Sequence, residues 1–310
     1  MASKFCIARL NESVQLVRFY EVFITSICVL NLVFSLVATI GNILVIRALR
    51  KASSIPPNVK TLFLSLASSD LAVGVLSQPM YGAIMAVMLK MASSGENNFA
   101  LFCPILLNAC YYIINFLSCT SFLNVIAIAF DRLLAIWLHL RYAELATAKR
   151  VLGSVVLLWL TSSMAALIFI VLPGGNFMVA AIIDFVGLFL TSMVYIRVFR
   201  VARSHENQIH QQLSQAQNAE ALELMREKKS AYNALYVYFV FLACYFPLVP
   251  SIILMQTDES KIFFVITYHA SMTLVFLNSS LNPIVYCWRY REVREIVKST
   301  LKRIIHINPN

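Results

Sequence analysis

The chain is dominated by a series of apolar blocks, each about 20 residues or longer. Such a block can cross the ~30 Å hydrocarbon core of a membrane as an α-helix. Backbone N–H and C=O groups in lipid must be satisfied internally, so a spanning segment is a helix or part of a closed barrel. The blocks therefore predict an all-α membrane protein, a seven-transmembrane helix bundle, with spans near residues 22–46, 61–89, 100–130, 151–172, 177–199, 233–256 and 262–287.

The composition agrees with a membrane protein. Charged residues make up 13% of the chain and the mean hydropathy is +0.76, whereas soluble domains average about 25% charged residues. The connections between the blocks are short, so no separate soluble domain is expected. We predict a short extracellular N-terminus over residues 1–21, the helix bundle over 22–287, and an amphipathic helix with a short cytoplasmic tail over 288–310.

The net charge of +10 carries a topology signal. Most of the 25 Lys and Arg residues fall in alternate connections and in the C-terminal segment. By the positive-inside rule, the N-terminus is extracellular and the C-terminus cytoplasmic. This asymmetry argues against a nucleic-acid partner.

Residues 1–21 lack the apolar core of a cleavable signal peptide, so the first helix is expected to act as a signal anchor to the plasma membrane. Asn11 begins a glycosylation sequon on the predicted outer side.

The C-terminal segment is expected to lie on the inner leaflet. Apolar residues after Trp288 recur every three or four positions, and cationic residues fill the other face. Such a helix places its apolar stripe in lipid and its cations near anionic headgroups, so membrane lipids are predicted partners.

The seven cysteines are not spaced as a disulfide framework or a metal site, since most fall inside predicted helices. Two alternatives stay open for Cys103. It pairs with Cys6 in the N-terminal segment, or it remains a free cysteine at the outer end of its helix.

Asp70 lies within the second apolar block, where a carboxylate is costly and marks a functional-site candidate. Residue counting places several amides and hydroxyls at a similar depth. Together they predict a polar pocket able to hold a small cation such as sodium, and the alternative is a network that only packs the helices. The set is Asn42, Asp70, Ser121, Asn278, Ser279 and Asn282.

A second charged group lies at the cytoplasmic end of the third block. Asp131 and Arg132 adjoin at the membrane exit, and Glu227 precedes the sixth block. An arginine with a neighbouring and a cross-helix carboxylate predicts a breakable latch whose loss lets the sixth helix move outward. The alternative is a pair of interfacial charges that only obeys the positive-inside rule.

These motifs together resemble the rhodopsin-like (class A) G-protein-coupled receptors over nearly the whole chain. The matching stretches are "GNILV", "LSLASSDLAVG", "DRL", Trp159, Tyr195 in "MVYIRVF", Pro247 in "CYFP" and "NPIVY". The closest likeness is to the adenosine–melanocortin branch. "DRLLAIWLHLRY" and "NPIVYCWRYREVRE" are similar to adenosine receptors, whereas the short second outer loop and Gly187 in place of a helix 5 proline are similar to melanocortin receptors.

The resemblance implies roles for these residues. The Asp70 set matches the family's sodium pocket, with no other cofactor required, and Asp131, Arg132 and Glu227 match its inactive-state latch. Tyr195 and Tyr286 match tyrosines that move inward on activation, and Leu140 matches an apolar residue that contacts the G protein. The chain is then a receptor rather than an enzyme. Its partners are a heterotrimeric G protein (the Gα subunit) and an extracellular ligand.

Departures from the family's motifs concern its activation motifs and restrict the chemical class of ligand expected. Leu133 replaces the usual tyrosine of the helix 3 triplet, and Tyr245 replaces the helix 6 tryptophan. Phe276 occupies the place of the opsin lysine, and Ile114 the place of the amine-binding aspartate. The predicted ligand is therefore small and neutral or lipid-like, and the residues expected to line its site are Ile114, Asn115, Tyr245, Ser251, Ile252, His269, Met272 and Phe276.

Two further functions are weighed against the receptor. A seven-helix transporter would show paired half-helices in two repeats, and the sequence has none. A receptor-like scaffold that no longer signals is suggested by Leu133 and Tyr245.

Overall fold

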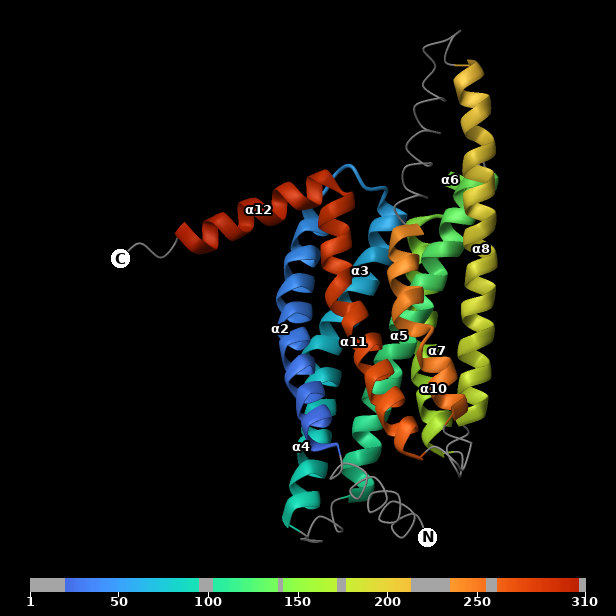
Figure 1. Cartoon of the computed structure of the whole chain (residues 1–310). Helices are drawn as coiled ribbons and strands as arrows, with labels where there is room; N and C mark the ends of the chain where they lie inside the picture. Colours follow the sequence, from blue (N-terminus) through green and yellow to red (C-terminus); the bar gives the residue numbers. More distant parts are fainter. Residues whose placement is uncertain are drawn as a thin grey trace.

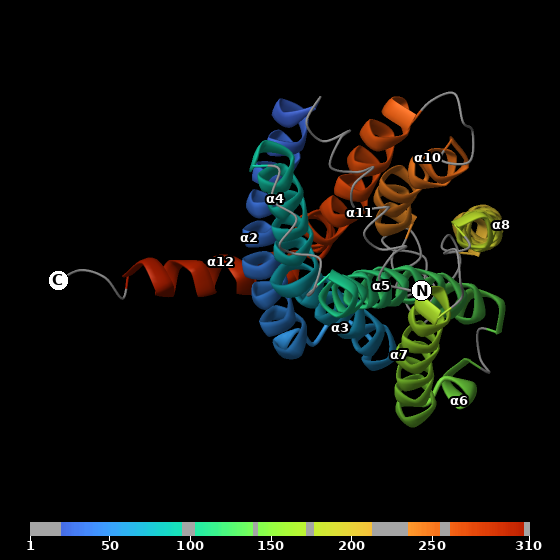
Figure 2. The same cartoon turned by 90° about the horizontal axis from the view of Figure 1, so that it is seen from below.

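The computed structural model describes residues 20–94, 103–138, 142–171, 177–212, 235–254 and 261–306. All regular structure in these ranges is helical, and the long helices run side by side as an up-and-down bundle (Figure 1). Figure 2 shows α5 tilted across the middle of the bundle. The elements in chain order are α2 (Glu21–Lys51), α3 (Pro57–Ala72), the π-helix η1 (Val73–Ser77), α4 (Gln78–Ser94), α5 (Cys103–Leu138), α6 (Tyr142–Leu145), α7 (Ala148–Val171), α8 (Phe177–Gln212), a helical stretch 235–245, α10 (Leu248–Leu254), α11 (Lys261–Arg289) and α12 (Arg291–His306).

Six segments within the described ranges are long and apolar enough to span a membrane. They are Glu21–Lys51, Pro57–Lys90, Leu107–Ala135, Ala148–Ile168, Ala181–Arg200 and Leu235–Ile253. The seventh predicted span is α11, which is 29 residues long and carries Asn278, Asn282 and Pro283 in its inner half. These polar residues lower its apolarity, because α11 contributes side chains to the bundle interior. The prediction of an all-α membrane bundle is confirmed.

The second span is not a regular α-helix. Between α3 and α4 the chain forms one π-helical segment at Val73–Ser77, which the sequence reading did not predict. A Cβ added at Gly74 would lie 2.9 Å from Thr39 Oγ1, so the glycine lets α2 approach closely. Ser35 Oγ donates to Gly74 O at 2.7 Å and satisfies a carbonyl of the irregular segment. The π-turn therefore begins three residues after Asp70 and is held by α2.

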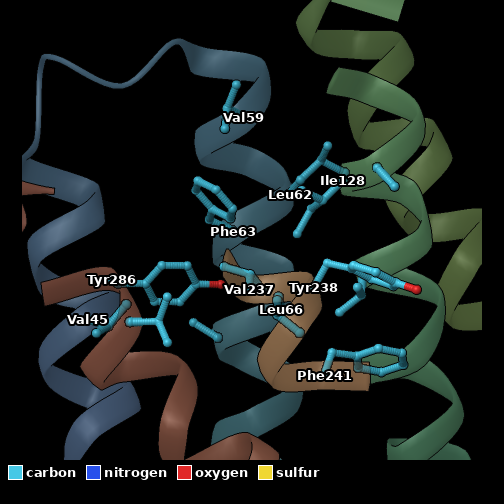
Figure 3. Close-up of a cluster of buried hydrophobic side chains, with 14 of the residues drawn as sticks. Val45, Val59, Leu62, Phe63, Leu66, Ile128, Val237, Tyr238, Phe241 and Tyr286 are labelled. Carbon is cyan, nitrogen blue, oxygen red and sulfur yellow. The ribbon is translucent and has the colours of Figure 1, made fainter. Parts of the chain in front are cut away.

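Apolar side chains divide between the bundle interior and the lipid-facing surface. Leu157 on α7 and Ile183 on α8 are each 62% exposed, as expected for side chains in contact with lipid. The interior near the cytoplasmic end is a cluster from α2, α3, α5, α11 and the stretch 235–245 (Figure 3). It includes Val45, Phe63, Ile128, Val237, Phe241 and Tyr286.

The amphipathic helix α12 turns away from α11 at the end of the bundle and points outward from it (Figure 1). Val293 and Val297 are buried, whereas the later apolar residue Ile304 is exposed. Glu292 ties α12 to the connection between α2 and α3, because its carboxylate accepts hydrogen bonds from the backbone N–H groups of Ser53 (2.8 Å) and Ser54 (2.9 Å). Both serine hydroxyls also donate to it. These bonds, led by the one from the Ser54 side chain, lower the pKa of Glu292 to about 2.

Candidate functional site

The Asp70 carboxylate is fully buried between α3, α5 and α11. Its Oδ1 accepts hydrogen bonds from Ser279 Oγ at 2.8 Å and Ser121 Oγ at 3.2 Å. Its Oδ2 accepts one from Asn282 Nδ2 at 2.7 Å. The structure therefore brings four of the six predicted pocket residues into direct contact at one point in the bundle.

The other two residues of the predicted pocket lie beside this contact rather than in it. Asn42 donates to the backbone oxygen of Ser279 at 2.9 Å and to Ala38 O at 2.8 Å, so it ties α2 to α11. Asn278 is fully buried, and neither its Nδ2 nor its Oδ1 has a hydrogen-bond partner within the described residues. Asn278 therefore forms no direct hydrogen bond with Asp70.

The residues present fit a small hard cation. A carboxylate, two hydroxyls and an amide oxygen are oxygen ligands of the kind that such ions prefer. Asn278 Oδ1 and Asn282 Oδ1 are buried acceptors without a partner among the described residues. A buried acceptor left unsatisfied costs about 1–3 kcal/mol, which favours a ligand or water that would satisfy it.

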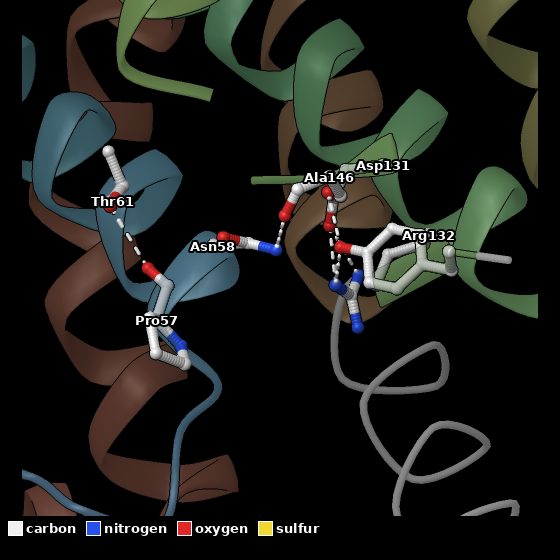
Figure 4. Close-up of polar contacts among 7 residues, drawn as sticks. Pro57, Asn58, Thr61, Asp131, Arg132 and Ala146 are labelled. Carbon is white, nitrogen blue, oxygen red and sulfur yellow. Dashed lines mark hydrogen bonds and ion pairs between the residues drawn. The ribbon is translucent and has the colours of Figure 1, made fainter. Parts of the chain in front are cut away.

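The second predicted group lies at the cytoplasmic end of α5 (Figure 4). The Arg132 guanidinium is buried and forms a salt bridge with the adjacent Asp131 carboxylate. Tyr142, on the short helix α6, donates to Asp131 Oδ1 at 2.7 Å. Asn58 at the start of α3 donates to the backbone oxygen of Ala146. The arginine is thus held by a carboxylate that α6 itself orients.

Three predicted residues lie outside the described residues: Asn11, Leu140 and Glu227. The proposed cross-helix half of the latch and the glycosylation site therefore stay predictions, as does the pairing of Cys103 with Cys6. Free cysteines among the described side chains are Cys28, Cys110, Cys119, Cys244 and Cys287.

Tyr195 and Tyr286 are both buried between Asp70 and the cytoplasmic end. Tyr195 stacks on Tyr238 with ring centroids 4.3 Å apart, and Tyr286 packs against Phe63 at 5.1 Å. Neither tyrosine hydroxyl has a hydrogen-bond partner within the described part of the chain. Each hydroxyl is thus available for a different bond in a second arrangement of the helices.

Most of the residues predicted to line the ligand site are buried. Ile114, Met272 and Phe276 belong to a buried apolar cluster of the outer half, and Ile252 and Ser251 are buried on α10. His269 is partly exposed, and its Nδ1 lies 2.6 Å from Tyr81 Oη. Tyr245 donates to Ser118 O at 3.3 Å, and Asn115 donates to Tyr111 O at 2.8 Å.

One polar residue of the outer half was missed by the sequence reading. Asp184 lies on α8, within the apolar span Ala181–Arg200. Its signal in the sequence is the same as that of Asp70, a carboxylate within an apolar block.

The fold and the buried polar core define a multi-pass helical membrane protein with a connected polar site running between its helices. A family model described as 7 transmembrane receptor (rhodopsin family) matches residues 41–178 and 175–286. The chain belongs to this family of G-protein-coupled receptors. The resemblance found in the sequence is confirmed.

Curated relatives agree with the predicted branch. The chain is 24% identical to melanocortin receptor 3 of Rattus norvegicus, covering 87% of this chain and 83% of the relative. It is 25% identical to adenosine receptor A2b of Gallus gallus, covering 91% and 89%. It is 27% identical to adenosine receptor A2a of Homo sapiens, covering 88% and 71%.

Proposed function

We propose that this receptor lies in the plasma membrane with its N-terminus outside, binds a small, largely apolar extracellular ligand, and drives nucleotide exchange on the Gα subunit of a heterotrimeric G protein. The observation that carries the proposal is the Asp70 contact, in which one carboxylate joins α3, α5 and α11 at the centre of the bundle. A buried acid held by three neutral donors is costly as a packing device and is typical of a functional site.

The proposed switch has two connected parts. At the centre, Asp70 holds Ser121 on α5 and both Ser279 and Asn282 on α11. One helical turn beyond Asn282, Tyr286 on α11 leads toward the cytoplasmic end, where Arg132 is held by Asp131. An agonist shifts the balance only by binding one arrangement better than the other. Rearrangement at Asp70 would move α11 relative to α5 and free Arg132 and the tyrosines for a G-protein helix.

We further propose an allosteric sodium ion at the Asp70 contact. Asp70, Ser121, Ser279 and Asn278 would supply oxygen ligands to it, and Asn42 and Asn282 would orient them. A bound cation would offset the buried negative charge of Asp70 and favour the arrangement in which α3, α5 and α11 stay joined.

The test is nucleotide exchange with purified receptor in lipid nanodiscs and a panel of Gα subunits. We expect basal or ligand-driven exchange on at least one Gα, and loss of that exchange in Arg132→Ala. Normal folding of the variant is checked by its thermal melt. An absence of stimulation for every Gα would contradict the proposal and favour the non-signalling scaffold, and electrogenic transport in proteoliposomes would favour the transporter.

The sodium site has its own measurement. Agonist affinity is compared in sodium and in a bulky organic cation, in wild type and in Asp70→Asn. We expect sodium to lower agonist affinity in the wild type only. Equal affinity in both salts for the wild type would make the Asp70 contact a structural one.

A further inference from the structure

The side chain of Asp184 belongs to the face of α8 that packs into the bundle. Ala181, Leu188, Thr191, Tyr195 and Val198 are all buried and recur at intervals of seven, three and four residues, which is one face of a helix. Asp184 falls on the same face, three residues after Ala181 and four before Leu188. The flanking residues Ile183 and Phe185 are 62% and 55% exposed and face lipid. The carboxylate is therefore on the interior side of α8.

The register between α8 and α5 places this acid opposite Cys119. A Cβ added at Gly187 would lie 2.5 Å from the Phe122 ring, so Gly187 and Phe122 mark where the two helices touch. Both helices run from the outer end to the cytoplasmic end. One turn outward from this contact is Asp184 on α8 and Cys119 on α5. Asp184 interacts electrostatically with Cys119 and with Tyr245 of the neighbouring helical stretch.

Within the part of the chain that the structure describes, no Lys or Arg of the helices around Asp184 lies near its depth. The described parts of α5 and of the stretch 235–254 carry no Lys or Arg outward of Arg132, and on α8 the first cation is Arg197, more than three turns away. On α7 the cations are Lys149 and Arg150 at the cytoplasmic end. Among the described residues Asp184 forms no ion pair and no side-chain hydrogen bond. A carboxylate at membrane depth without a partner among the described residues is costly, which favours a cationic partner.

We propose that Asp184 anchors the extracellular ligand, and that this ligand is a small amphiphile with one cationic nitrogen. The nitrogen would bind the Asp184 carboxylate between α5 and α8, and the apolar body would contact apolar side chains of the outer half such as Ile114 and Ile252. This rests on the proposed receptor function and refines its ligand class. It replaces the neutral ligand that the apolar lining alone had indicated.

Cys119 is a partly exposed residue, and the reactivity of its thiol offers a direct probe of the site. Full-length receptor in nanodiscs is treated at pH 8 with two methanethiosulfonate reagents of similar size. One carries a trimethylammonium group and the other a sulfonate. The rates at Cys119 are read by mass spectrometry and divided by the rates of the same reagents with free 2-mercaptoethanol, which removes their intrinsic difference. Cys119→Ser identifies modification at the other cysteines.

We expect the normalised rate to favour the cationic reagent on the order of tenfold, as the charge of a neighbouring carboxylate implies. Asp184→Asn should abolish the preference and Asp184→Glu should retain it. If Asp184→Asn does not fold, Asn115→Cys in the Cys119→Ser background reports from one turn further outward, with a smaller preference for the cation. Equal normalised rates in the wild type, an unreactive Cys119, or a preference that survives in Asp184→Asn would overturn the proposal.

The same preparations separate this proposal from the proposed function. Nucleotide exchange is measured on each before modification. A charge preference at Cys119 with no exchange on any Gα would contradict the receptor mechanism and leave the cation site standing. Nucleotide exchange without a charge preference at Cys119 would contradict the cation site and leave the receptor mechanism standing.

Discussion

Substitutions at Asp70 can separate its hydrogen bonds from its charge. In Asp70→Asn, the remaining Oδ1 still accepts from Ser121 and Ser279, and the new Nδ2 faces Asn282 Nδ2. The Asn282 Oδ1 has no partner among the described residues, so its side-chain amide can turn over and accept from the new Nδ2. Asp70→Asn should therefore keep all three contacts in neutral form.

Asp70→Ala removes the acceptor altogether. The Ser121 and Ser279 hydroxyls can rotate to carbonyls in the preceding turn of their own helices. The Asn282 amide can turn in the same way, as Asn42 does toward Ala38 O, but the three hydrogen bonds that join α3 to α5 and α11 are then lost, at about 0.5–1.5 kcal/mol each. Residue 70 is uncharged in both variants, so the free-energy cost of burying a carboxylate does not contribute to the difference in their stability. We expect Asp70→Ala to be about 2 kcal/mol less stable than Asp70→Asn.

The assay is thermal unfolding in detergent micelles, followed by tryptophan fluorescence with both variants in the same buffer. About 2 kcal/mol corresponds to a melting temperature roughly 4 °C lower, or more, for Asp70→Ala. A third variant, Asn282→Ala in the Asp70→Ala background, should melt close to Asp70→Ala itself, because the hydrogen bond from Asn282 to residue 70 is already lost. Equal melting temperatures for Asp70→Asn and Asp70→Ala would refute the reasoning, since the three bonds would then contribute nothing.

Two further predictions concern packing and pH. Gly187→Ala should destabilise the receptor by about 1–3 kcal/mol in the same melt, because its Cβ would overlap the Phe122 ring; Gly153→Ala, which meets nothing within 4 Å, is the matched control and should be neutral or stabilising. The Glu292 contact has a pKa lowered to about 2, below the 4.5 of a free carboxyl, so its contribution is complete above pH 4.5 and is lost as the pH falls through about 2. Hydrogen exchange at the Ser53 and Ser54 amides should therefore stay slow at neutral pH and quicken in Glu292→Gln, and equal exchange in both proteins would count against the contact.

The Asp70 contact could be predicted because the sequence contains few polar side chains that could be its partners. Polar residues are rare within apolar blocks, and counting from the membrane edges places them at a depth to within about one helical turn. That was enough to bring Asp70 together with Ser121, Ser279 and Asn282. Depth alone was not enough for Asn278, because a similar depth does not determine which side chains come into contact.

The π-helical turn at Val73–Ser77 had no comparable signal. One extra residue in a helical turn changes no composition and leaves the block apolar. It depends on Gly74 lying against Thr39 and on Ser35 satisfying the Gly74 carbonyl, and both contacts come from α2. Such a feature becomes visible only when the neighbouring helix is in place.

Asp184 was missed for a different reason, which bears on how any membrane helix is read. In a soluble helix the apolar stripe marks the buried face. On α8 both faces are apolar, since Ile183 and Phe189 face lipid while Leu188 and Val198 are buried. The interior face is distinguished by what lipid excludes, the small and polar residues, which on α8 recur as Asp184, Gly187 and Thr191 at intervals of three and four. A search for that pattern would have placed the acid inside the bundle from the sequence. It would also have changed the ligand expected, because a single interior carboxylate without a protein cation outweighs an apolar lining in selecting what binds.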